Sequence, residues 1–168
     1  MTDFARLMSD YFVKYLAGQK GSGSNTMKTY RDTFVQLLEF MDEKKHIRAD
    51  CIEVDSFSYD IINEFLEYLE KEKRVSISTR NNRLAAIRSF FKYTGYHEPK
   101  YLNISTSIRE ISKKKTEGRQ MNYLSVNAME HFLNSFDKTD HKELRCFCIV
   151  LLLYESGARV TELCNVRR

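Results

Sequence analysis

The sequence has no tryptophan, a single proline and six glycines in 168 residues. Because proline and glycine interrupt regular structure, so few of them favour long helices over many short strands. The four cysteines form no C-x-x-C pair, and no histidine and cysteine cluster has the spacing of zinc ligands. We therefore expect reduced thiols, with neither a disulfide framework nor a metal site.

Long hydrophobic runs are also lacking. The longest, residues 146–154, has nine residues, whereas a bilayer-spanning helix needs about 20. The N-terminal segment mixes acids with its apolar residues and lacks the basic region and apolar block of a signal peptide. We expect a cytoplasmic protein that has no membrane partner.

Acidic residues are absent between Glu72 and Glu98. Residues 74–120 hold 11 Lys/Arg against 3 Asp/Glu, a net charge of +8, while residues 1–73 have a net charge of −4. Soluble surfaces usually mix both signs, so a segment of one sign suggests an anionic partner. A basic face that pairs with the acidic first segment inside the fold is an equally good interpretation.

Apolar residues recur at helical spacing in four stretches of the first 98 residues. We expect these helices to begin at Phe4, at Ser24 or Asn25, after Ser58, and after Ser76 or Ser78. The fourth should end before Gly95. Four amphipathic helices joined by short loops make a small helical bundle, so the predicted fold class is all-α.

The helical period is lost in residues 99–120, which contain the run Lys113-Lys114-Lys115. This pattern predicts an exposed linker between a helical domain, residues 1–98, and a second domain, residues 121–168. In the second domain we expect helices after Ser125 and at Asp140 or Lys142. The latter helix is apolar on all sides, and 48 residues are too few to surround it. We therefore interpret the chain as the front part of a longer protein.

The start of the fourth helix gathers hydroxyls, amides and guanidiniums. A helix N-terminus already favours a phosphate, and long basic side chains can reach one. Asn82, Ala85 and Ser89 form an uncharged outer face that would allow close approach to a DNA groove. The alternative is a solvated face with ordinary caps. The candidate DNA-binding residues here are Ser78, Thr79, Arg80, Asn82, Arg83, Arg88 and Lys92.

Two further segments share this composition. The start of the second helix contributes the candidates Ser24, Thr26, Lys28 and Arg31, although these residue types are also routine at helix starts. The candidates Lys113, Lys114 and Lys115 would contact the DNA backbone, or form a solvated linker.

Near the C-terminus an apolar helix should end at Gly157, so that Arg159 follows at a turn and Glu162 lies three residues further on. A rigidly held guanidinium can bind two oxygens of a phosphate, and a carboxylate can orient that guanidinium. A purely structural pair between Arg159 and Glu162 fits the spacing as well.

The run LLLYESGARVTELCNVR resembles the box around the first catalytic arginine of the tyrosine recombinase (phage integrase) family. The match covers Ser156, where threonine is commoner, Gly157, Arg159, Glu162 and Leu163. Upstream, Tyr123-Leu124-Ser125 resembles the start of the family's catalytic domain. The phrases SNTMKTYRDTFVQLLEFM and SISTRNNRLAAIRSFFKYTG are similar to its N-terminal core-binding domain.

The resemblance implies a SAM-like four-helix core-binding bundle followed by the first helices of a mixed α+β catalytic domain. It implies DNA strand breakage and rejoining through a 3′-phosphotyrosyl link on double-stranded DNA, in a synapse of four protomers. No metal, nucleotide cofactor or small-molecule substrate is expected. Arg159 would be the first catalytic arginine.

The family's lysine, its H-x-x-R box and its nucleophilic tyrosine lie downstream of this box and have no counterpart in the 168 residues. We therefore expect this chain to bind DNA weakly and to be catalytically inactive. Two other functions fit the same residues: a truncated integrase that binds DNA without catalysis, and a helical protein–protein interaction module.

Overall fold

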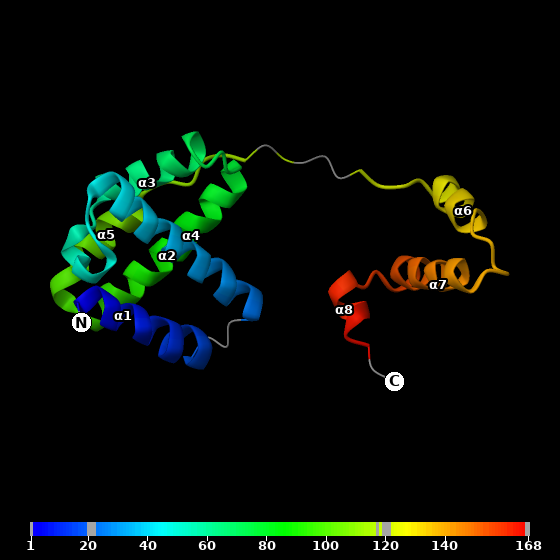
Figure 1. Cartoon of the computed structure of the whole chain (residues 1–168), viewed down its shortest axis with the longest axis horizontal. Helices are drawn as coiled ribbons and strands as arrows, with labels where there is room; N and C mark the ends of the chain where they lie inside the picture. The colour runs from blue at the N-terminus through cyan, green and yellow to red at the C-terminus, as the bar shows by residue number, and fades with distance from the viewer. Residues whose placement is uncertain (1, 20–22, 117, 119–121, 167–168) are drawn as a thin grey trace. The chain divides into compact units, whose positions relative to one another are not determined.

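A computed structural model describes residues 2–19, 23–116, 118 and 122–166 and divides the chain into two compact units, Met1–Glu117 and Gly118–Arg168 (Figure 1). Most of the described residues are helical, and none of them lies in a β-strand. The prediction of an all-α fold is therefore confirmed for this part of the chain.

The first unit begins with α1 (Asp3–Asp10), which continues into a π-helix, η1 (Tyr11–Gln19). It contains the long helices α2 (Ser24–Lys45), α3 (Tyr59–Lys71) and α4 (Ile77–His97), with short 3-10 turns η2 (Ala49–Cys51) and η3 (Val54–Ser56) between α2 and α3. The Ser58 and Ser76 side chains each accept a hydrogen bond from the backbone N–H three residues on, so these two predicted caps are confirmed.

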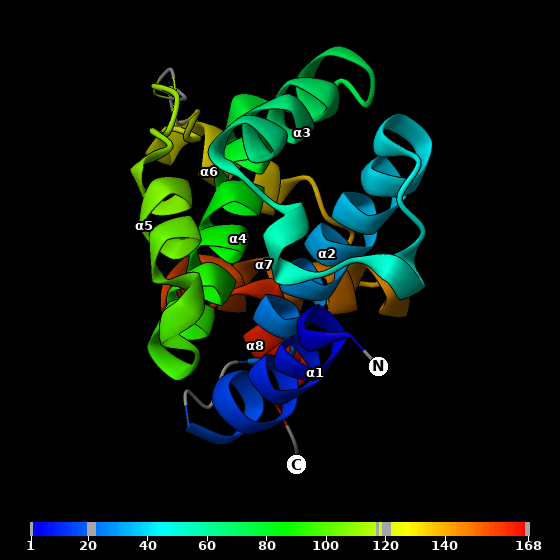
Figure 2. The ribbon, with the colours of Figure 1, turned by 90° about the vertical axis from the view of Figure 1, so that its left-hand side faces the viewer.

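The centre of the first unit is α4. It packs against α2 and α3 on one side and against α5 (Leu102–Glu110) on the other (Figure 2). The buried ring of Phe90 meets the rings of Phe4, Tyr11 and Phe34 edge-on at centroid distances of 5.5, 5.4 and 5.3 Å. Because α4 is covered by several helices, little of its circumference reaches solvent.

The prediction that residues 99–120 form an exposed linker is wrong for the first half of that segment. A 3-10 turn, η4 (Pro99–Tyr101), leads into α5, and Ile108 and Ile111 are buried. Within its described residues the first unit therefore has five α-helices, where four were predicted. Helix α5 is short and carries three apolar residues among nine, which is too few to mark a helix in the sequence. Residues 117, 119 and 120 of the predicted linker lie outside the described residues.

Gly95 does not end α4, which continues to His97. A Cβ on Gly95 would lie 2.7 Å from both Cβ and Oγ of Ser105 on α5, closer than such atoms can approach. This glycine therefore allows α4 and α5 to pack closely, and the prediction that it terminates the helix is wrong.

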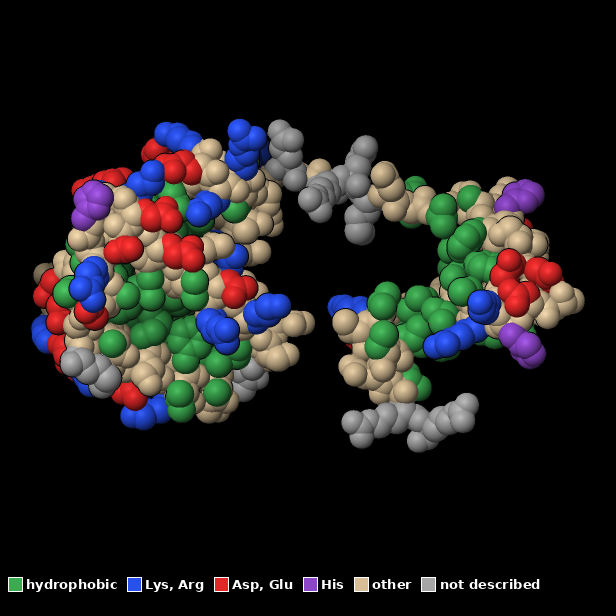
Figure 3. All heavy atoms as spheres, in the orientation of Figure 1, with side chains coloured by type: hydrophobic (Ala, Val, Ile, Leu, Met, Phe, Trp, Pro, Cys, Tyr) green, Lys and Arg blue, Asp and Glu red, His purple; other side chains and the backbone are tan. Residues whose placement is uncertain are grey.

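The second unit contains α6 (Val126–Asn134), α7 (His141–Ser156) and α8 (Val160–Cys164), with the predicted caps at Ser125 and Asp140. Hydrophobic side chains lie open on its surface (Figure 3), and none of its described residues is buried. Leu152, in the apolar run of α7, is 48% exposed. The prediction that this segment cannot surround α7 is confirmed. Among the described residues, no helix combines the length and the apolar character that crossing a bilayer requires.

Candidate nucleic-acid interface

A hollow of about 550 Å³ lies where the first turns of α4 meet the chain that follows α5. It unites two segments that are more than 30 residues apart in the sequence. Its described lining residues contribute hydroxyls, amides and three ammonium groups, and none of them carries a carboxylate. The residues that line it are Ser78, Asn81, Asn82, Lys113, Lys114, Lys115 and Thr116. A concave surface of this charge is suited to phosphate groups.

The α4 side of this basic hollow is built on a capped helix start. Ser76 accepts the Thr79 N–H, and the Thr79 hydroxyl lies 3.0 Å from Ser76 Oγ, so the Thr79 side chain belongs to the cap. Ser78 and Asn82 are exposed and four residues apart, and therefore lie on one face of the helix. Their polar groups stand beside the helix N-terminus, whose dipole favours an anion.

Arg80 lies inside the first unit. Its side chain is 7% exposed, its Nε lies 3.1 Å from Oε1 of Glu70 on α3, and its Nη1 donates to the Ser112 carbonyl at 3.2 Å. The predicted position on an outer, DNA-facing surface is therefore corrected: this guanidinium ties α3 and the chain after α5 to α4.

Arg83 and Arg88 also bind the protein itself. Arg83 Nη1 donates to the Thr29 carbonyl and to Thr33 Oγ1 on α2, at 3.0 and 3.2 Å, and Arg88 Nη2 donates to the Ile111 carbonyl. Both side chains are half-buried because α2 and α5 cover the two sides of α4. The prediction that these two side chains reach out to DNA is therefore also corrected: both guanidiniums bind other segments of the first unit.

The start of α2 is close to the second turn of α4, because Arg83 joins the two helices at Thr29. Gly23 occupies the cap position of α2, so the predicted cap at Ser24 or Asn25 is wrong by one or two residues. The predicted candidates of this segment are exposed, namely Ser24, Thr26, Lys28 and Arg31.

Lys92 lies outside the basic hollow. It lines a separate hollow of about 330 Å³ with Tyr15, Tyr93, Tyr96 and His97. It follows Ser78 by fourteen residues, which is about 21 Å along a helix. The structure does not bring it together with the basic hollow.

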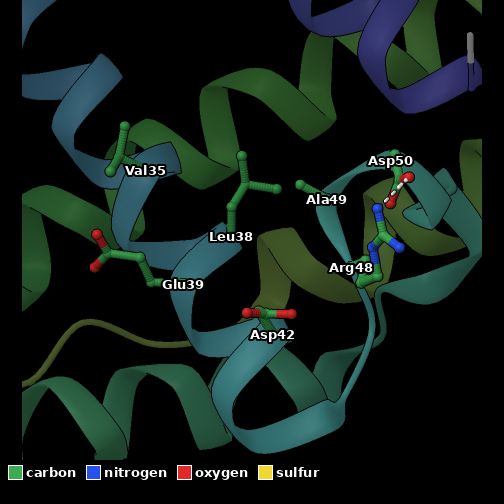
Figure 4. A pocket seen from close by; sticks show the side chains of 7 residues that line it. All are labelled: Val35, Leu38, Glu39, Asp42, Arg48, Ala49 and Asp50. Carbon is green, nitrogen blue, oxygen red and sulfur yellow. Dashed lines mark hydrogen bonds and ion pairs between the residues drawn. The ribbon is translucent and has the colours of Figure 1, made fainter.

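A third hollow, of about 590 Å³, lies between α2 and η2 (Figure 4). Its carboxylates are Glu39, Asp42 and Asp50, and its one cation, Arg48, pairs with Asp50 at 3.0 Å. Like charges repel, so this acidic lining does not suit a phosphate backbone.

In the second unit, α7 ends at Gly157 in the left-handed conformation (φ 62°), and Arg159 is the cap of α8. Glu162 accepts hydrogen bonds from Arg159 Nη1 at 2.9 Å and from the Arg159 backbone N–H at 2.8 Å. The backbone N–H and then the guanidinium hold the pKa of Glu162 below its usual range. The Arg159 side chain is 82% exposed, so its guanidinium is oriented and still accessible.

Asn81 and Glu70 are not among the residues predicted from the sequence. Both act on the chain after α5: Asn81 pairs with the Lys114 backbone, and Glu70 pairs with the Lys114 ammonium. Their partner lies in the segment predicted to be a linker, so no local pattern marks either one. Within the described part of the chain, no group of three or more His, Cys, Asp or Glu could hold a metal ion.

Comparison with known proteins identifies similar sequences. Residues 10–99 match the family model described as phage integrase, N-terminal SAM-like domain. The integrase/recombinase y4rC of Sinorhizobium fredii is 27% identical over 164 residues, covering 98% of this chain and 49% of that protein. Tyrosine recombinase XerC of Staphylococcus aureus (strain USA300) is 26% identical over 163 residues, covering 96% and 51% respectively. The chain spans about half the length of these curated relatives. No solved structure matches it.

Proposed function

The chain belongs to the phage integrase family, and from this premise we propose that it is the DNA-binding N-terminal portion of a site-specific tyrosine recombinase. The observation that carries the proposal is the basic hollow, where the start of α4 meets the lysine run and none of the described lining residues is acidic. The first unit is then the core-binding domain. The second unit is the first part of the catalytic domain.

The partner of the basic hollow is double-stranded DNA. Ser78 and Asn82 offer hydrogen bonds beside the N-terminus of α4, and the ammonium groups of Lys113 and Lys115 contact phosphates. Lys28 and Arg31 on the exposed start of α2 extend the contact. Such contacts position the protein on the duplex and depend steeply on salt concentration.

Arg159 is the first catalytic arginine of the complete recombinase. Its guanidinium, accessible and braced by Glu162, holds two oxygens of the scissile phosphate. The complete protein breaks and rejoins DNA through a 3′-phosphotyrosyl link, without a metal or nucleotide cofactor, and assembles as four protomers on DNA. These steps are carried over from the family resemblance.

Fluorescence anisotropy on a labelled duplex at several salt concentrations tests DNA binding. We expect the logarithm of the association constant to fall linearly with the logarithm of salt concentration. Lys113→Ala/Lys115→Ala should lower the magnitude of this slope by about 2, since each lost phosphate contact removes about 0.9. Lys14→Ala, which removes one charge on η1 where Lys14 pairs with Asp10, should leave the slope nearly unchanged.

Two results would contradict the binding proposal. Salt-independent binding, or none, would instead favour a helical protein–protein interaction module. An equal slope for the lysine variant and the Lys14 variant would show that the basic hollow is not where DNA binds.

The catalytic assignment is tested on nicked suicide substrates. The 168-residue chain should form no covalent DNA–protein adduct, because the nucleophilic tyrosine of the family has no counterpart in it. Denaturing gel electrophoresis detects such an adduct directly. Its appearance would refute the roles assigned here.

A further inference from the structure

Residues 111–114, the exit strap, are the chain that leaves α5 and leads into the lysine run. Three side chains of α4 bind its backbone. Arg88 donates to the Ile111 carbonyl, Arg80 donates to the Ser112 carbonyl at 3.2 Å, and Asn81 binds Lys114. The exit strap is therefore held along α4. The first turns of this helix also form the side of the basic hollow that faces the lysine run.

The contact between Asn81 and Lys114 uses both polar atoms of the Asn81 carboxamide and both polar groups of the Lys114 backbone. Asn81 Nδ2 donates to the Lys114 carbonyl at 2.8 Å, and the Lys114 N–H donates to Asn81 Oδ1 at 3.1 Å. This is the two-way exchange that a neighbouring strand makes with a residue of an antiparallel sheet. A single carboxamide therefore fixes both the position and the orientation of one peptide segment.

Glu70 fixes the side chain of the same residue. Its Oε2 lies 2.7 Å from Lys114 Nζ, while its Oε1 lies 3.1 Å from Arg80 Nε. The middle lysine of the run is therefore engaged by α3. Lys113 and Lys115 make no ion pair with any described residue, so their ammonium groups are the two available to a ligand of the hollow.

We propose that Asn81 is a positioning residue that holds the exit strap in place, so that Lys113 and Lys115 meet the same duplex as Ser78 and Asn82. The inference rests on the proposed function. An unfixed strap would have to be ordered when DNA binds, and the conformational entropy lost would weaken binding. Asn81 strengthens DNA binding in this way without contributing a charge.

Amide hydrogen exchange tests the hold on the strap in the absence of DNA. In Asn81→Ala the Lys114 amide should exchange at least tenfold faster than in the parent chain. Asn81→Asp keeps the acceptor for this N–H and loses the donor, so its exchange should be intermediate. Asn103→Ala, on the exposed face of α5, is the matched control and should leave the Lys114 amide unchanged.

Anisotropy titrations then test the consequence for DNA. Asn81→Ala should weaken binding about fivefold without changing the salt slope, because the number of phosphate contacts stays the same. In the Lys113→Ala/Lys115→Ala background the same substitution should have no further effect. General destabilisation of the fold would instead weaken binding by the same factor in both backgrounds, so this double-mutant cycle separates the two roles.

The exchange and titration results together test the positioning role of Asn81. Unchanged exchange at Lys114 in Asn81→Ala, or an equal loss of affinity in both backgrounds, overturns the positioning role. Faster exchange with a loss confined to the parent background supports it. If the parent chain shows no salt-dependent binding, the proposed function fails, and with it the positioning role on DNA, while the exchange result still reports whether Asn81 holds the strap.

Discussion

Three consecutive residues near the start of α4 have three different surroundings. Arg80 is buried against Glu70, Asn81 binds the backbone of Lys114, and Asn82 is exposed at the basic hollow. Successive residues of a helix point about 100° apart, so each one meets a different neighbour. Arg80 and Asn81 therefore hold neighbouring segments against α4, whereas Asn82 is part of the surface of the basic hollow.

Removing the buried partner of Arg80 should destabilise the first unit. Glu70→Ala leaves the Arg80 guanidinium without its carboxylate, and we expect the free energy of unfolding to fall by about 3 kcal/mol. Glu67→Ala, which breaks the exposed pair between Glu67 and Lys71, should change stability little. Urea denaturation followed by circular dichroism measures both. An equal loss of stability in Glu70→Ala and Glu67→Ala would contradict the role of Glu70 as the buried partner of Arg80.

The close approach of α4 and α5 should not tolerate a methyl group. Gly95→Ala places a Cβ 2.7 Å from Ser105, and we expect a loss of about 1–3 kcal/mol in the free energy of unfolding. Gly95→Ala/Ser105→Gly should recover part of the loss in thermal melts. At Gly118, which lies outside the helices, a Cβ would meet nothing within 4 Å, so Gly118→Ala is the control. A wild-type melting temperature for Gly95→Ala would refute this explanation of the glycine.

At the scale of elements, helix starts were predictable and helix surroundings were not. Ser58, Ser76, Ser125 and Asp140 cap helices as predicted, because capping depends on residues within one turn. Helix α5 was missed because it has nine residues and three apolar side chains, and its buried side is defined by packing against α4.

A charged contact joins α1, at the start of the first unit, to η4. Asp3 Oδ2 lies 2.6 Å from Lys100 Nζ and accepts the Tyr101 hydroxyl at 2.9 Å. The hydrogen bond from Lys100, and then that from Tyr101, hold the pKa of Asp3 below its ordinary value of 3.8. Because folding lowers this pKa, the contact stabilises the fold above about pH 4 and loses its effect as the pH falls through the folded-state value.

Asp3→Asn should therefore lower the urea midpoint at pH 6 and have progressively less effect as the pH is lowered toward 2. Lys100→Met removes the ammonium donor to Asp3, so it should also lower the urea midpoint at pH 6 and have less effect as the pH is lowered toward 2. Urea titrations of the three proteins at matched pH values measure this. A difference between wild type and Asp3→Asn that stays constant from pH 6 to pH 2 would contradict it.

At the scale of the whole molecule, the two units differ in what they bury. The first unit encloses a core of aliphatic and aromatic side chains, whereas no described residue of the second unit is buried. Helices of this length are marginal in water without tertiary packing. The second unit should therefore be much the less stable of the two.

Hydrogen exchange measured by mass spectrometry on the whole chain checks this difference. We expect the backbone amides of α7 to exchange at least a hundredfold faster than those of α4, because local opening of α7 exposes little additional surface. Peptides from α2 and α3 serve as internal references. Protection of α7 equal to that of α4 would show that its apolar surface is covered in solution.

The sequence by itself determined the helical fold class, most helix starts, the net positive charge of residues 74–120 and the turn that presents Arg159 beside Glu162. Each of these depends on residues within a few turns of one another. Only the tertiary structure decided which basic residues of α4 face solvent. The partners that Arg80, Asn81, Arg83 and Arg88 bind lie between 10 and 54 residues away along the chain, in elements that pack against α4.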